Sequence, residues 1–192
     1  DGLLRFFQAY AAMLPQQLDR LNLALRSQGL DHLVGKINSD LPPDVVFAKD
    51  EGIDGRVSIH TGIIEEINFT ERFDASTCLL VLHFVDTIEE KRSLLKKVRE
   101  NLKPGSPFVL VSMFGDQAQS EFDERMNLWK SIWLDLTDLE PEDVDAMEES
   151  VRELSFIPAS QIEELLEEAG FERISQFFST TLFGGWICHV RK

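Results

Sequence analysis

The sequence has few cysteines and no long apolar run. Its two cysteines, Cys78 and Cys188, lie inside apolar strand-like segments, so we expect buried thiols rather than a disulfide or a metal pair. No apolar run approaches the roughly 20 residues that a membrane span needs. The first residues also lack the basic-then-apolar pattern of a signal peptide. These absences predict a cytoplasmic protein without a membrane partner.

Positive charge is also scarce. Lysine and arginine number 19 against 34 aspartates and glutamates, which gives a net charge of −15. Such a surface does not neutralise phosphates, so nucleic acid is excluded as a main partner. Much of the acid lies in Asp135–Glu149, where we expect it to serve solubility.

The residue patterns of metal centres and covalent catalysis are missing. His32, His60, His83 and His189 have no partners at metal-ligand spacing. No Ser-His-Asp or Cys-His arrangement has sequence support. We therefore predict neither a metal site nor a covalent nucleophile.

The length of 192 residues suits one domain, 1–192, with a substantial core. Hydrophobic periodicity and the turn residues predict an α/β order that ends in an antiparallel hairpin around Gly184-Gly185. Ser160 and Glu163 predict a capping box for the last helix, and Gly170 its end. The expected helices are Leu3–Leu14, Leu18–Arg26, Asp44–Lys49, Thr87–Asn101 and Gln161–Ala169, with an interrupted helical insert at 117–154; the expected strands are His32–Asn38, Arg56–His60, Ala75–Leu82, Phe108–Met113 and two within Arg173–Val190.

Two of these strands indicate where a site lies. Ala75–Leu82 and Phe108–Met113 are short, apolar throughout and joined by a helix, which is typical of a parallel sheet covered on both faces. Ligands of such sheets bind beyond the carboxyl ends of the strands. This places His83, Phe84, Met113 and Phe114 near a candidate site. His83 is either a general base near neutral pH or a structural histidine bonded to the backbone.

Four segments together resemble the class I S-adenosylmethionine-dependent methyltransferases. They are RVSIHTGIIEEI (Arg56–Ile67), FDASTCLLVLHFV (Phe73–Val85), LLKKVRENLKPGSPFVLV (Leu94–Val111) and the end of the chain from Ile162 to Lys192. The resemblance implies a doubly wound, mostly parallel, Rossmann-like sheet of seven strands with the last one antiparallel. It also implies a methyl donor, S-adenosylmethionine, over the strand ends and a helical lid at 117–154.

The chain departs from this family at three points. It contains no G-x-G-x-G loop, which lets the backbone approach the donor's amino-acid end. A strand and turn of about ten residues are missing at that place; either the natural protein has a segment that this sequence omits, or the sheet has repacked. The acid expected after the second strand is replaced by Asn38, Ser39 and Asp40. Gly62 is followed by Ile63 and Ile64 instead of an aspartate.

The function that we expect is methyl transfer from S-adenosylmethionine to a small molecule, without a catalytic side chain, because the sulfonium donor is already activated. The alternative is a non-catalytic methyltransferase-like binding or interaction module. Leu80 and Ile63 should border one hollow. The sequence leaves open whether the protein forms a homodimer. The resemblance implies donor contacts from Asn38, Ser39, Asp40, Gly62, Ile63, Ile64, Leu79, Leu80 and His83, and substrate contacts from Met113, Phe114, Trp129 and Trp133, the two tryptophans being equally well placed for the core.

Overall fold

The computed structural model describes residues 58, 60 and 63–192. The chain divides into two units, Asp1–Thr61 and Gly62–Lys192, and the architecture below is that of the second. The elements expected before residue 61 lie wholly or almost wholly outside the described residues, as do Asn38, Ser39, Asp40 and Gly62. The single domain over 1–192 therefore stays a prediction.

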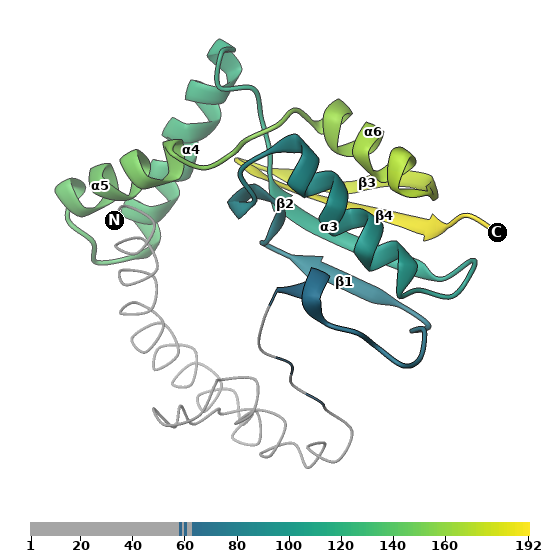
Figure 1. Ribbon diagram of the computed structural model, residues 1–192. Coiled ribbons are helices and arrows are strands. Elements are labelled where there is room, and N and C mark those ends of the chain that lie inside the picture. The colour runs from purple at the N-terminus through teal and green to yellow at the C-terminus, as the bar shows by residue number, and fades with distance from the viewer. Residues whose placement is uncertain (1–57, 59, 61–62) are drawn as a thin grey trace, which may run out of the picture. The chain divides into compact units, whose positions relative to one another are not determined.

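A mixed four-stranded sheet with the order β1-β2-β4-β3 organises this unit (Figure 1). β1 (Ser76–Leu79) pairs in parallel with β2 (Pro107–Met113). β4 (Phe183–Val190) is antiparallel to both β2 and β3 (Phe171–Thr180). The chain is thus α/β, and the expected terminal antiparallel hairpin is confirmed.

Helix α3 (Ile88–Glu100) connects the two parallel strands, as the sequence predicts. Thr87 and Glu90 form a capping box in which each side chain accepts a hydrogen bond from the other residue's backbone N–H. Leu94, Leu95 and Val98 recur at helical spacing and are all buried. Capping and an apolar stripe together explain why the helix begins after Thr87 and packs on the sheet.

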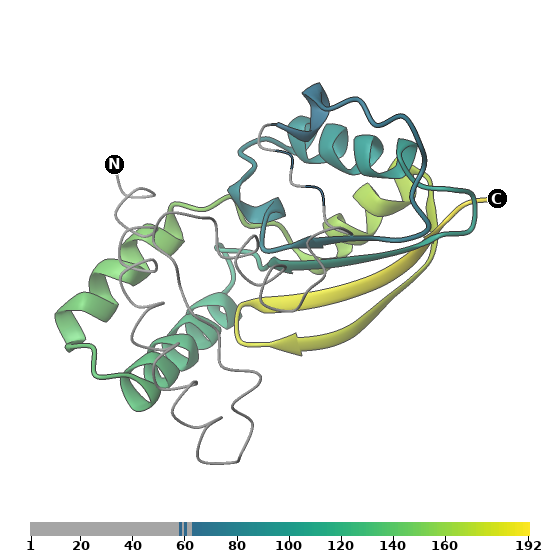
Figure 2. The ribbon, with the colours of Figure 1, turned by 90° about the horizontal axis from the view of Figure 1, so that it is seen from below.

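The core lies between the sheet and two helices, α3 and α6 (Ala159–Ala169), which cover the same face (Figure 2). On β2 the side chains of Phe108 and Leu110 are buried on this face, while Val109 and Val111 on the other face are only half-buried. Among the described residues helices cover one face only, so the doubly wound arrangement stays a prediction. The most deeply buried core side chains are Leu82, Leu95, Leu102, Phe108, Leu110, Ile162, Leu166, Phe171, Trp186, Cys188 and Val190.

The interrupted helical insert is confirmed as α4 (Ser120–Leu136) and α5 (Pro141–Arg152). Pro141 stands at the first position of α5, where its missing N–H costs nothing. Lys130 of α4 contacts Asp145 and Glu148 of α5, each at 2.6 Å, and so joins the pair. No helix among the described residues is long and apolar enough to cross a membrane.

Two local predictions are wrong. The hairpin turns at Thr181 and Leu182, whereas Gly184 and Gly185 lie within β4, paired with Ser179 and Phe178. The second error is the capping box at Ser160. Helix α6 begins at Ala159 after Pro158, and the Glu163 carboxylate accepts instead from the Trp186 indole N–H at 3.3 Å.

Strand β1 is shorter than the expected Ala75–Leu82. It ends at Leu79 because Leu80 adopts a left-handed conformation, with φ at 59°. The chain then forms a 3-10 turn, η4 (Leu82–Phe84). A left-handed residue cannot continue a strand, so the chain leaves the sheet at this point.

Candidate functional site

An open hollow of about 780 Å³ lies beside β1 and beneath α3. Its wall includes Ile63 and Ile64 at the start of the 3-10 turn η3 (Ile64–Glu66), the length of β1, and Val81 with the stretch Phe84, Val85 and Asp86. Glu90, Ser93, Leu94 and Val98 of α3 complete it. Two of the apolar residues that line it are exposed: Ile63 is 61% exposed and Val81 is 44% exposed. Exposed apolar side chains gathered at one hollow are typical of a ligand-binding surface.

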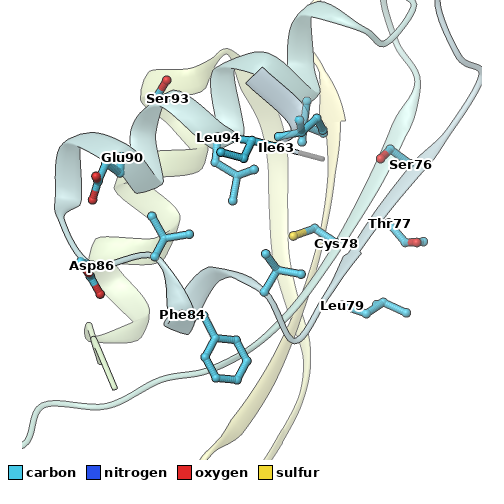
Figure 3. A pocket seen from close by; sticks show the side chains of 14 residues that line it. Ile63, Ser76, Thr77, Cys78, Leu79, Phe84, Asp86, Glu90, Ser93 and Leu94 are labelled. Atoms are coloured by element: carbon cyan, nitrogen blue, oxygen red, sulfur yellow. The ribbon is translucent and has the colours of Figure 1, made fainter. Parts of the chain in front are cut away.

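The strand presents different side chains to its two faces at this hollow (Figure 3). Cys78 points from β1 toward α3, while Thr77 and Leu79 point away on the opposite face. β1 is an edge strand within the described part of the chain, because β2 is its only partner there. The hollow therefore follows the open edge of β1 as well as its carboxyl end.

Polar groups lie at the α3 side of the hollow. The carboxylates of Asp86 and Glu90 and the hydroxyl of Ser93 appear there (Figure 3). Hydrogen bonds from Thr87 lower the pKa of the Glu90 carboxyl, which keeps it ionised. Cys78 is the opposite case, since burial raises the pKa of its thiol to about 11. It is therefore protonated and unreactive at neutral pH.

Of the donor residues expected from the sequence, Ile63, Ile64 and Leu79 come together in the hollow. Leu80 does not line it, although its neighbours Leu79 and Val81 do. The expectation that Leu80 and Ile63 border one hollow is therefore wrong for Leu80. Its left-handed backbone is the reason, because it breaks the alternation of the strand.

His83 is buried and hydrogen-bonded within the fold. Its Nδ1 accepts from the backbone N–H of Met113 at 3.1 Å and lies 3.1 Å from the Ser112 hydroxyl. Burial, aided by the nearby charge of Lys91, lowers the pKa of His83 to about 4. The ring does not line the hollow; it attaches the turn η4 to the end of β2.

The residues expected to contact substrate are mostly core residues. Met113 and Trp129 are buried, and Trp133 is half-buried with its ring 6.0 Å from that of Trp129. Phe114 is buried against Trp186 and beneath the guanidinium of Arg125. Phe114 also lines a further hollow, of about 310 Å³, between the end of β2, the start of α4 and the start of α6.

Two groups of residues were missed from the sequence. Val81, Asp86, Glu90 and Ser93 line the main hollow although nothing in their spacing marks them. Lys91 is fully buried, and Leu94, Leu95 and Val98 of the same helix are also buried. A signal for Lys91 was present, since it lies three residues after Ile88 and three before Leu94, on the apolar stripe of the helix.

Comparison with known proteins agrees with this architecture. No protein-family model matches the chain, and no curated protein is significantly similar to it in sequence. Many solved structures match its fold. The S-adenosylmethionine-dependent methyltransferase SibL in its apo form has a TM-score of 0.54 and 16% identity, over 76% of this chain and 39% of that one.

Two further structures are comparable. A possible exported protein from Bordetella parapertussis has a TM-score of 0.57 and 18% identity, over 76% of this chain and 48% of that one. An O-methyltransferase family 2 protein from Planctomyces limnophilus, in complex with apigenin, has a TM-score of 0.52 and 13% identity, over 77% of this chain and 38% of that one. The fold is that of the class I methyltransferases. The chain spans less than half the length of each of these three structures.

Proposed function

We propose that this chain takes part in methyl transfer from S-adenosylmethionine to a small-molecule acceptor, with the donor's nucleoside in the hollow beside β1. The observation that carries the proposal is the position of that hollow. It reaches the carboxyl end of β1 in a sheet of the methyltransferase type, where ligands of α/β sheets bind.

The hollow fits part of the donor. Ile63 and Val81 offer apolar surface of the kind on which an adenine ring packs. The Asp86 carboxylate stands at the rim, where it would favour a positively charged group. The described residues include no glycine cradle for the donor's amino-acid end.

Within this proposal the protein positions the donor and the acceptor and excludes water, and it supplies no acid–base catalyst. The bound donor supplies an activated methyl group on a sulfonium, which passes to a nucleophilic atom of the acceptor. The acceptor gives up its proton to solvent. The described residues would hold the two molecules in line and keep water away. The helical pair α4–α5 follows β2 directly and would serve as the lid.

A binding experiment with a matched pair of variants tests the donor site. Isothermal titration of the full chain with S-adenosylmethionine and S-adenosylhomocysteine should give micromolar dissociation constants. These correspond to binding free energies of about −8 kcal/mol. Ile63→Asp puts a charge on the apolar wall and should weaken binding about tenfold or more. Leu136→Asp makes the same change at an exposed position of α4 outside the hollow and should leave affinity unchanged.

The alternative is a non-catalytic binding module, which the absence of a G-x-G-x-G loop from the 192 residues favours. The same titration separates the two. If neither S-adenosylmethionine nor S-adenosylhomocysteine gives a heat of binding at two temperatures, donor binding is refuted. The non-catalytic binding module is then the supported function. If binding occurs, incubation with labelled donor and a panel of small hydroxylated aromatic compounds, apigenin among them, should show transfer of label.

A further inference from the structure

Lys91 is a lysine without any exposed surface. Its ammonium donates to three backbone carbonyls: Leu82 at 2.8 Å, Val85 at 2.5 Å and Ser155 at 3.1 Å. An ammonium group has three N–H donors, and here each has an acceptor. Lysine is rarely buried unless it is paired in this way. The three carbonyls therefore fix the position of the Lys91 ammonium.

The three carbonyls belong to two segments that are far apart in the sequence. Leu82 and Val85 bracket the turn η4, and the neighbouring Val81, Phe84 and Asp86 line the main hollow. Ser155 lies in the connection that leaves α5, the last helix of the insert. Lys91 therefore joins one wall of the hollow to the exit of the insert.

Ser155 makes two more bonds across the same junction. Its backbone N–H donates to the His83 carbonyl at 3.1 Å, and its hydroxyl donates to the Asp86 carbonyl at 2.7 Å. His83 in turn accepts from the Met113 N–H of β2. The junction thus connects the turn, the insert and the sheet through hydrogen bonds.

We propose that Lys91 is a positioning residue that couples the helical insert to the wall of the donor hollow. If the insert moves away at Ser155, one N–H of a buried ammonium loses its acceptor. That loss costs more than the loss of a neutral hydrogen bond, because the charge stays out of water. The turn η4 and the exit of the insert therefore move together. Closure of the insert over an acceptor then shifts the wall of the hollow that contacts the donor. This inference rests on the proposed function for its role in catalysis, but the coupling itself can be tested without a ligand.

Hydrogen exchange of the full chain tests the coupling. Lys91→Met keeps the apolar stem and removes the three donors; Lys96→Met makes the same change at an exposed position of the same helix. In Lys91→Met we expect the amides of both Val81–Val85 and Ser155–Ile157 to exchange at least about tenfold faster, and in Lys96→Met neither. Acceleration in one segment only, or in none, would overturn the proposal.

A stability-matched variant separates positioning from general loosening. Val98→Ala removes core volume from the same helix and should lower the melting temperature by a similar amount. It should leave the exchange of the two segments close to that of the unchanged protein. If it accelerates them as much as Lys91→Met does, Lys91 has only a structural role and the proposal fails.

Two further measurements keep the test decisive. If Lys91→Met does not fold, Ser155→Ala replaces it: this change removes one bond of the junction and should speed exchange at Phe84 and Val85, and no change there would refute the coupling. Titration with S-adenosylhomocysteine should show about tenfold weaker binding to Lys91→Met than to Lys96→Met. If the unchanged protein does not bind this nucleoside, the proposed function fails, while the exchange experiment still decides the role of Lys91.

Discussion

Gly184 and Trp186 lie on the same face of β4, and a Cβ atom at Gly184 would come within 2.7 Å of the Trp186 ring. It would also lie 2.8 Å from the ring of Phe114. Both aromatic side chains are buried and contact each other edge to face. The glycine is therefore required by packing, not by a turn.

This relationship predicts that Gly184→Ala destabilises the protein. The added methyl group must displace buried rings, which costs about 1–3 kcal/mol. Chemical denaturation should show the lower midpoint. Ser179→Ala, at the position that pairs with Gly184 on β3, is the control and should change stability little. Equal stability of Gly184→Ala and the unchanged protein would mean that the rings pack differently from the structure.

The capping box of α3 predicts a second effect. Thr87→Ala removes the hydroxyl that accepts from the Glu90 N–H at 3.2 Å, at a cost of about 1 kcal/mol. Thr87→Ser should restore most of the loss. The hydrogen bonds from Thr87 lower the pKa of Glu90 in the folded state, so they stabilise the fold above the unfolded pKa of this carboxyl. The difference between Thr87→Ala and the unchanged protein should therefore shrink as pH falls below about 4.

Thiol labelling tests the two cysteines and the hollow together. Burial raises the pKa of Cys78 to about 11 and that of Cys188 to about 12. At pH 8 Cys78 should react with iodoacetamide about 100-fold and Cys188 about 1,000-fold more slowly than a free cysteine, since only the thiolate reacts. S-adenosylhomocysteine should slow Cys78 further, because Cys78 lines the hollow, and leave Cys188 unchanged. Equal protection of both would indicate a general stabilisation and no occupancy of the hollow.

Lys91 predicts a pH dependence of stability. Burial lowers its pKa to about 8 from the usual 10.5, while Asp86 and Glu90 act in the opposite direction. Folding therefore disfavours the charged form. The resulting penalty is fully present below pH 8 and disappears as pH rises toward 10.5. Relative to Lys91→Met, the unchanged protein should gain stability over this range.

Urea denaturation at several pH values measures this difference, and Lys96→Met serves as the comparison because Lys96 is exposed on the same helix. The curve for Lys96→Met should parallel that of the unchanged protein between pH 8 and 10.5. A parallel curve for Lys91→Met as well would show that Lys91 is not desolvated in the folded state.

The sequence was sufficient wherever a local pattern also decided the packing. Helix α3, strand β2, the end of α6 at Gly170 and the interrupted insert all follow from apolar periodicity and from helix-ending residues. The buried state of Cys78 and Cys188 follows from the same patterns. In each case one face of one element packs on the core, and the spacing of apolar residues along the sequence predicts that face.

The tertiary structure alone decided the rest, because distant residues competed for the same groups. Glu163 has the spacing of a capping residue but accepts a hydrogen bond from the Trp186 indole. Gly185 is of a residue type typical of turns, but its lack of a side chain leaves space for the Phe178 ring. Lys91 is a surface residue by type, and only three carbonyls from two distant segments make its burial tolerable. Local sequence determines which elements form; the contacts between them determine which side chains line the hollow.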